Sequence, residues 1–131
     1  KTLAEEETWI KNTIINMKEN KSFVCWAICD NKIIGDCSVN RGGTREWHVG
    51  KIGLMVDQDF RRDGIGGYLL EYVLNQAKNM KIKIVSLDVF SDNTIAIELY
   101  EKLGFKKYSL LPKGFYRQGK YSDALKMYKD L

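Results

Sequence analysis

The chain has 131 residues, of which 44% are hydrophobic and 29% charged, and its formal net charge is +4 at pH 7. This length and composition predict a single soluble domain over residues 1–131 with enough apolar material for a core. No stretch of about 18 apolar residues occurs, so we expect no membrane-spanning helix. The basic excess is small and scattered, which suits a small anionic ligand better than nucleic acid.

Three cysteines, Cys25, Cys29 and Cys37, stand early in the chain. Their number is odd and no two have C-x-x-C spacing, so we expect neither a disulfide framework nor a bound metal. Cysteine in an apolar, strand-like stretch behaves as a small hydrophobic residue. The pattern favours a reducing, cytoplasmic setting.

In the first half of the chain, apolar residues at helical spacing predict a helix over residues 4–19, with acidic residues in its first turn. Residues 22–30 and 32–39 are apolar, β-branched or aromatic, and the turn-forming Asn31 between them predicts a β-hairpin. A longer third strand is predicted over residues 46–56, with two glycines inside it.

In the second half, apolar periodicity predicts a helix over residues 65–77, and capping residues predict another over residues 93–105. Between these helices, residues 82–90 are apolar enough to form a strand buried on both faces. Residues 105–111 and 121–129 predict two further strands around a polar loop. The order of elements indicates an α+β domain, with helices packed on one predominantly antiparallel sheet.

A glycine-rich segment, FRRDGIGG over residues 60–67, opens the helix at 65–77. A helix N-terminus has unpaired backbone N–H groups and partial positive charge, and glycines let those groups approach a ligand without Cβ clashes. Arg61 and Arg62 add permanent positive charge. The segment predicts a cradle for a pyrophosphate, although the pattern alone also fits a purely structural turn.

Two other phosphate-binding motifs do not fit this segment. A P-loop requires Lys-Ser or Lys-Thr after its last glycine, which neither Gly64 nor Gly66 has. A dinucleotide-binding fingerprint opens a parallel βαβ unit and has a third, spaced glycine. Here three predicted antiparallel strands come first, and the glycines end at Gly67.

These residues make the chain resemble the GNAT superfamily of N-acetyltransferases, which transfer acetyl from acetyl-CoA to a primary amine. The family signature after a long strand, Q/R-x-x-G-x-G/A, is matched by residues 61–66. A second family segment, with Asn, then Ala, then Tyr-x-x-x-Gly-Phe, is matched by Asn93, Ala96 and residues 100–105. The resemblance extends over nearly the whole chain.

The resemblance implies a GNAT-like acyl-CoA N-acyltransferase fold, whose sheet splays between the strands at 46–56 and 82–90. In the family, a strand and a helix precede the helix predicted here at 4–19, and a partner chain that supplied them would make a homodimer. Acetyl-CoA is the implied cosubstrate, without a metal, and its pantetheine fills the wedge of the sheet. The implied cofactor-binding residues are Leu54, Met55, Val56, Arg61, Arg62, Asp63, Gly64, Ile65, Gly66, Gly67, Asn93, Ala96, Tyr100 and Lys102.

The resemblance also implies that Tyr100 is the general acid. A phenol with a pKa of about 10 can protonate the leaving thiolate without being ionised at pH 7. By spacing alone, a helical core position is the favoured interpretation of Tyr100, and the family context reverses it. The general base stays open between Glu46 and His48, two apart on the predicted strand, with Asp88 as a third candidate. Lys51 stands near where the family commonly has an acid.

We expect direct transfer in a ternary complex, to a small amine, an amino-acid derivative, or a peptide or protein amine. A non-catalytic acyl-CoA-binding module is the main alternative, because Lys51 leaves a direct carboxylate base in doubt. A nucleic-acid-binding protein is disfavoured, because no recognition-helix or aromatic–basic pattern is present. Candidate residues for the acceptor pocket are Trp9, Trp47, residues 41–45, Phe115, Tyr116 and Tyr121.

Overall fold

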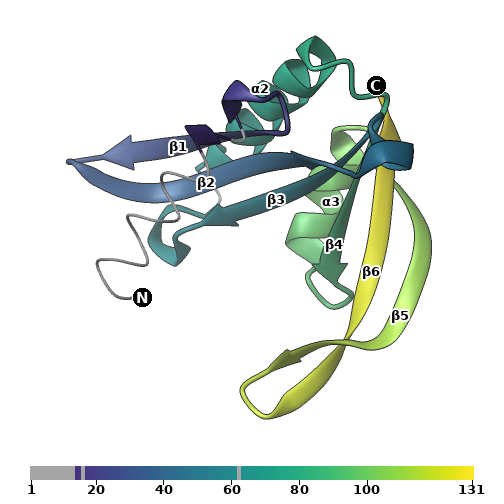
Figure 1. The fold of residues 1–131 in the computed structure, drawn as a ribbon. Coiled ribbons are helices and arrows are strands. Elements are labelled where there is room, and N and C mark those ends of the chain that lie inside the picture. The colour runs from purple at the N-terminus through teal and green to yellow at the C-terminus, as the bar shows by residue number, and fades with distance from the viewer. Residues whose placement is uncertain (1–13, 16, 62) are drawn as a thin grey trace.

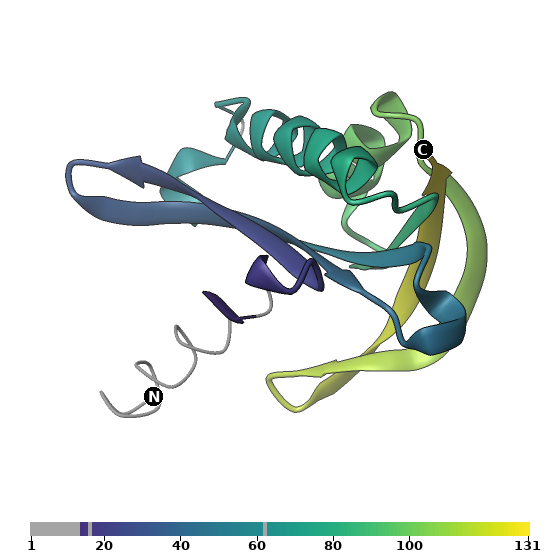
Figure 2. The ribbon, with the colours of Figure 1, turned by 45° about the horizontal axis from the view of Figure 1, so that its top comes forward.

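The computed structural model describes residues 14–15, 17–61 and 63–131, which form a six-stranded sheet with helices α2 and α3 on one face (Figure 1, Figure 2). The strand order is β1-β2-β3-β4-β6-β5, and β3–β4 is the one parallel pair. The predicted architecture, a predominantly antiparallel sheet flanked by helices, is confirmed. The helix predicted over residues 4–19 lies largely outside the described residues.

The first three strands are β1 (Ser22–Cys29), β2 (Lys32–Arg41) and β3 (Val49–Val56). The predicted hairpin between β1 and β2 is confirmed. Its two turn residues, Asp30 and Asn31, have φ values of 50° and 63°. Asp and Asn are the side chains that tolerate this left-handed conformation best, so the sequence itself selects the turn.

The third strand begins later than the sequence predicts. Thr44–Glu46 form a short 3-10 helix and His48 lies in the turn after it, so β3 starts only at Val49. Arg41 accounts for the difference, because its guanidinium donates to the backbone oxygen of Trp47 and lies 4.2 Å from the centre of that ring. This contact holds residues 42–48 in a compact loop.

The helix α2 (Ile65–Asn79) packs on the sheet through the predicted apolar face; its buried residues are Leu69, Leu70, Val73, Leu74 and Ala77. The strand β4 (Ile84–Phe90) follows, and then α3 (Thr94–Lys102), whose cap Asn93 accepts a hydrogen bond from the Ala96 amide at 3.2 Å. Both predicted helices are confirmed. Of the helices in the described part of the chain, none is long and apolar enough to cross a bilayer.

Two predictions about the second half are wrong. In β4 one face is buried, through Val85, Leu87 and Val89, and the other face is only half-buried because it carries Ser86 and Asp88. A polar loop does not separate the last two strands.

The last strands, β5 (Lys106–Arg117) and β6 (Lys120–Asp130), instead continue through that region to a tight turn. Its two residues, Gln118 and Gly119, both have positive φ, at 51° and 76°. The pairing of β6 with β4 ends at Ala124, so the rest of the hairpin extends beyond the sheet as an arm (Figure 1).

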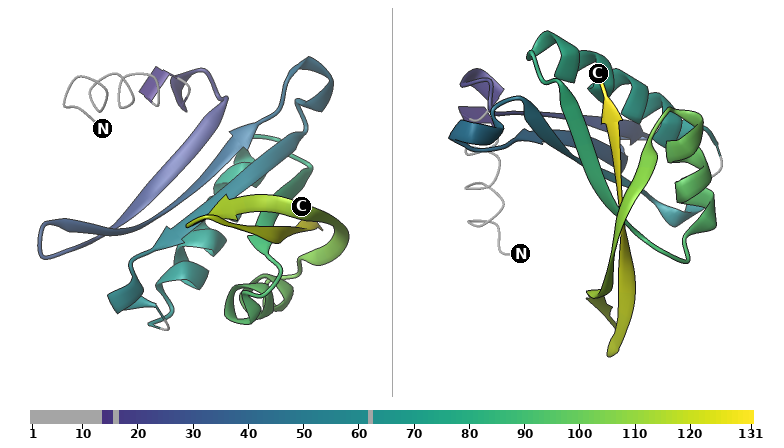
Figure 3. Two further views of the ribbon diagram at one scale, coloured as in Figure 1. Left: turned by 90° about the horizontal axis from the view of Figure 1, so that it is seen from below. Right: turned by 90° about the vertical axis from the view of Figure 1, so that its right-hand side faces the viewer.

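The parallel pair at the centre of the sheet is short. β3 and β4 are paired at only three positions, the last of which is Lys51 with Ser86. Beyond it, β3 stays paired with β2 as far as Val56, and β4 stays paired with β6 as far as Phe90. The sheet therefore opens into two diverging halves, β1-β2-β3 and β4-β6-β5, as Figure 3 shows from two directions.

Gly50 lies where β3 and β4 are still paired, and close packing there leaves no room for a side chain. A Cβ at this position would lie 2.6 Å from Val39 Cγ2 and 3.2 Å from Ile82 Cδ1, and both neighbours are buried. We predict that Gly50→Ala lowers the free energy of unfolding by about 1–3 kcal/mol, the usual cost of overpacking a core. Urea denaturation measures the change. Gly43→Ala is the control, because its added Cβ would meet nothing within 4 Å; equal stability of the two variants would contradict the prediction.

Candidate active site

The opening between β3 and β4 has a free strand edge on its β3 side. The Asp57 amide donates to the Ile34 carbonyl at 2.7 Å, which fixes the alternation of the β2–β3 ladder. By that alternation, Leu54 and Val56 turn their N–H and C=O groups away from β2 and toward the opening, while Met55 turns its own toward β2. An edge of this kind can pair with an extended ligand as if the ligand were another strand.

The start of α2 lies at one end of this edge. Gly64 caps the helix with a φ of 81°, a conformation that favours glycine, and no side chain caps the first turn. Among the described residues, the first amide of α2 that donates to a preceding carbonyl is that of Tyr68, which bonds to the Gly64 carbonyl at 3.1 Å. In that part of the chain, which leaves out Arg62, the amides of Ile65, Gly66 and Gly67 have no backbone partner and can bind an anion.

The flanking loop residues differ in their contacts. The Arg61 side chain is hydrogen-bonded to the end of β3, because its Nε donates to the Val56 carbonyl at 3.1 Å. Asp63 is exposed, as expected for an acid beside an anion site. Arg62 lies outside the described residues.

Gly66 marks the point where three elements meet. A Cβ on Gly66 would lie 3.5 Å from Leu99 of α3 and 3.7 Å from both Leu54 and Val56 of β3. These are ordinary contact distances, so no close protein contact requires a glycine here. The glycine instead leaves room in front of the helix amides, next to the free edge of β3.

Tyr100 lies on the helix side of the opening. It is 7% exposed, packs edge-on against the Phe105 ring at 5.8 Å, and lies near Cys37, the β2 residue opposite Leu54. Burial, with a smaller contribution from Cys37, raises the pKa of Tyr100 to about 12. Tyr100 therefore keeps its proton at neutral pH, and its phenol O–H is available as a donor.

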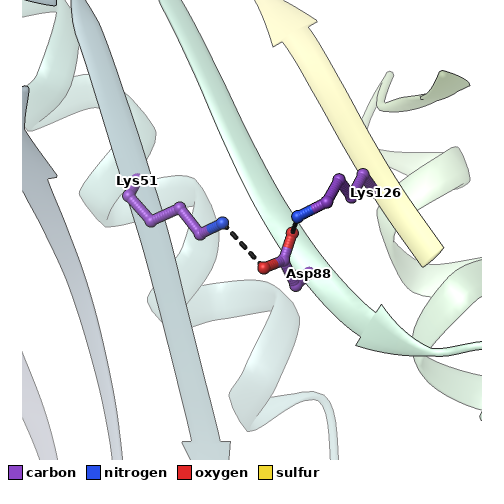
Figure 4. A network of polar contacts seen from close by, with 3 residues as sticks. All are labelled: Lys51, Asp88 and Lys126. Carbon is purple, nitrogen blue, oxygen red and sulfur yellow. Dashed lines mark hydrogen bonds and ion pairs between the residues drawn. The ribbon is translucent and has the colours of Figure 1, made fainter. Parts of the chain in front are cut away.

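Asp88 lies on the other face of the sheet, two residues beyond the last β3–β4 pair (Figure 4). Its carboxylate is shared by two ammonium groups, with Lys51 Nζ 2.9 Å from Oδ2 and Lys126 Nζ 3.1 Å from Oδ1. Burial alone would raise the pKa of Asp88, but the hydrogen bonds and charges of the two lysines outweigh burial and lower it. Asp88 is therefore ionised at neutral pH.

The other candidate bases lie elsewhere. Glu46 and His48 do not share a strand face, because one is in the 3-10 helix and the other in the turn. The His48 carbonyl accepts from the amides of Lys83 and Ile84, at the joined end of β3 and β4. From Val49 to Leu54 the strand covers about 16 Å, so both side chains lie far from the open end. Their role as base stays a prediction, and the geometry favours Asp88.

The aromatic residues predicted for an acceptor pocket are divided between two separate places. Trp47 lines a surface hollow of about 710 Å³ with Arg41, at the joined end of the sheet. Phe115 stacks on Phe90 at 4.3 Å, and Tyr116 is exposed near the tip of the β5–β6 arm. Tyr121 pairs with Tyr116 there, and Trp9 lies outside the described residues.

Sequence reasoning missed Lys126, the second partner of Asp88. The signal was present, because Lys126 stands between the buried Leu125 and Met127 on β6, and strand alternation puts it on the opposite face. Of the remaining predicted cofactor residues, Ala96 is half-buried beside the core and Lys102 is exposed in the last turn of α3.

Comparison with known proteins shows which family the chain belongs to. The model of the acetyltransferase (GNAT) family matches residues 2–105. An L-amino acid N-acetyltransferase of Escherichia coli, AaaT, is 30% identical over 77% of this chain and 64% of its own length. A ribosomal protein bS18-alanine N-acetyltransferase of Salmonella typhimurium is 32% identical over 56% of this chain and 50% of its own. The chain thus spans about half to two thirds of these curated relatives.

The fold also matches solved acetyltransferases. A GNAT superfamily phosphinothricin acetyltransferase from Sinorhizobium meliloti, in complex with acetyl-CoA, superposes with a TM-score of 0.83 at 19% identity, over 97% of this chain and 69% of that one. Such a likeness concerns the fold, whereas the family model matches most of the sequence itself. The chain belongs to the acetyltransferase (GNAT) family.

Proposed function

We propose that the protein is an acetyl-CoA-dependent N-acetyltransferase that transfers acetyl directly to a primary amine in a ternary complex. The observation that carries this proposal is the opening between β3 and β4, which joins a free strand edge at Leu54 to the unpaired amides of Ile65–Gly67. An extended arm ending in a pyrophosphate fits this combination. Relatives named as N-acetyltransferases, and a structural neighbour in complex with acetyl-CoA, support it.

The two titratable groups at the opening have complementary roles in the proposed reaction. The amine attacks the thioester carbonyl carbon, the C–N bond forms, and the C–S bond breaks. Tyr100 gives its proton to the departing thiolate. Asp88, ionised on the opposite face, holds the incoming ammonium and accepts one of its protons directly or through water. The second proton leaves the nitrogen as the C–S bond breaks and passes through water to the Tyr100 phenolate, which restores the acid.

The alternative is a non-catalytic acyl-CoA-binding module. Lys51 favours it in one respect, because an ion-paired Asp88 of lowered pKa is a weak base. It predicts acetyl-CoA binding without release of CoA in the presence of any amine. The variants below separate binding from turnover.

Gly66→Val tests the cradle. The added Cβ would lie at ordinary contact distance from Leu99 and Leu54, so we expect a folded protein, and the two further methyl groups of valine would fill the space in front of the helix amides. We predict loss of the acetyl-CoA-induced rise in melting temperature. In the parent protein, saturation at 100 times Kd corresponds to about 2.7 kcal/mol.

The control is Asn75→Val, which puts the same β-branched side chain on the exposed face of α2. It should retain the ligand-induced shift. An unchanged shift in Gly66→Val would exclude the helix N-terminus as the pyrophosphate site.

Tyr100→Phe tests the acid. An acid acts only in the transition state, so we predict a fall in kcat of about 10²-fold or more with little change in acetyl-CoA affinity. Release of CoA thiol measures kcat, and calorimetry measures affinity. Tyr108→Phe, at an exposed position on β5, is the control. Full activity of Tyr100→Phe at neutral pH would remove Tyr100 from the mechanism.

The tyrosine titration tests the environment of Tyr100. Its pKa is raised above that of an unfolded tyrosine, so it stabilises the fold below about pH 10, and that contribution is lost as the pH rises through about 12. We predict that one of the seven tyrosines ionises last in an ultraviolet titration, and that Tyr100→Phe removes this last step. Loss of an earlier step instead would show that the hydroxyl is not buried.

A further inference from the structure

The charges around Asp88 restrict which amines can bind beside it. One carboxylate lies between two ammonium groups, at 2.9 Å from Lys51 and 3.1 Å from Lys126. Neither lysine has another acidic partner among the ion pairs of the described residues. The cluster therefore carries a net positive charge, although it contains the group that would hold the substrate amine.

Other charged groups lie on the same face, among them Arg117 and Asp36. Arg117 lies over the Phe90 ring at 4.4 Å, and Phe90 is two residues from Asp88 on the same side of β4. Asp36 of β2 lies opposite Met55, and burial raises its pKa. The cations thus flank Asp88 from both sides of the opening, with Lys51 on β3 and Lys126 on β6, and the second acid lies on β2.

A substrate that carries only positive charge fits this arrangement poorly. An ammonium hydrogen-bonded to Asp88 would lie within about 6 Å of both lysine ammoniums, where like charges repel. A plain amine, a polyamine and an ordinary peptide N-terminus all meet this repulsion. A substrate with a carboxylate next to its amine avoids it, because the ammonium can bind Asp88 while the carboxylate binds the lysines.

We propose that the acceptor is a free amino acid, whose ammonium binds Asp88 and whose carboxylate is bound by Lys51 and Lys126. This inference rests on the proposed function and names the substrate class of the same site. Beyond Asp88, Phe90 is stacked on Phe115 at 4.3 Å, and Arg117 lies over the Phe90 ring at 4.4 Å. The probes are two amino acids with apolar side chains, L-phenylalanine and L-leucine.

The experiment compares these amino acids with the same molecules lacking the carboxylate, phenethylamine and 3-methylbutylamine. A third class of probe is a tripeptide amide with a free N-terminus. Release of CoA from acetyl-CoA gives kcat/KM for each. We expect each amino acid to exceed its decarboxylated partner and the peptide by at least about tenfold.

Two variants of Lys51 test its part in this preference. Lys51→Met should lower the ratio of kcat/KM between L-phenylalanine and phenethylamine, mainly by raising KM for the amino acid, and Lys51→Arg should restore much of it. Lys106→Met is the control, because Lys106 is exposed at the start of the edge strand β5. An unchanged ratio in Lys51→Met would overturn the assignment.

The possible failures are distinguishable. If phenethylamine or the peptide is acetylated as well as the amino acids, the inference is overturned and the proposed function stands. If acetyl-CoA raises the melting temperature but none of the amines releases CoA, both the transferase function and the inference are overturned. If acetyl-CoA gives no shift, the cofactor site itself is overturned.

Discussion

The divergence of β3 from β4 after only three paired residues is the constraint on which the rest of the site depends. A continuous sheet separates its two faces, whereas this one is open at its centre. Tyr100 approaches the opening from the helix side, and Asp88 and its lysines lie on the other face. A thioester in the opening would thus have a proton donor on one side and an amine-binding carboxylate on the other.

The fold supports this opening because the backbone hydrogen bonds of each strand are made with its other neighbour. β3 is fully paired with β2, and β4 with β6. The Val56 carbonyl, which points toward the opening, accepts a hydrogen bond from Arg61. The N–H and C=O of Leu54 have no strand partner on that side, so water or a ligand must supply one. A ligand paired there would extend the sheet that binds it.

Much of this could be predicted from the sequence, because the signals are local. The hairpin turn at Asp30–Asn31, the helix cap at Asn93 and the glycines at 64–67 each act on their own neighbours in the chain. Apolar periodicity and capping residues placed the two helices correctly, and the family resemblance implied the splayed strands.

The errors have long-range causes. Arg41 shortens β3 by donating hydrogen bonds to the backbone oxygens of Trp47 and of Met80, which is far along the chain. No local sequence pattern predicts this contact. The interaction of Lys51 and Lys126 with Asp88 joins three strands that only the sheet order brings side by side. The identity of the base could not be read from spacing for the same reason.

Amide hydrogen exchange, followed by NMR with and without acetyl-CoA, tests the central claim most directly. If the ligand lies along the free edge of β3, the Leu54 amide, unpaired in the free protein, should exchange more slowly when acetyl-CoA is bound. The Val39 amide, already inside the sheet, serves as the reference and should change much less. Binding of acetyl-CoA without any added protection at Leu54 would contradict the account.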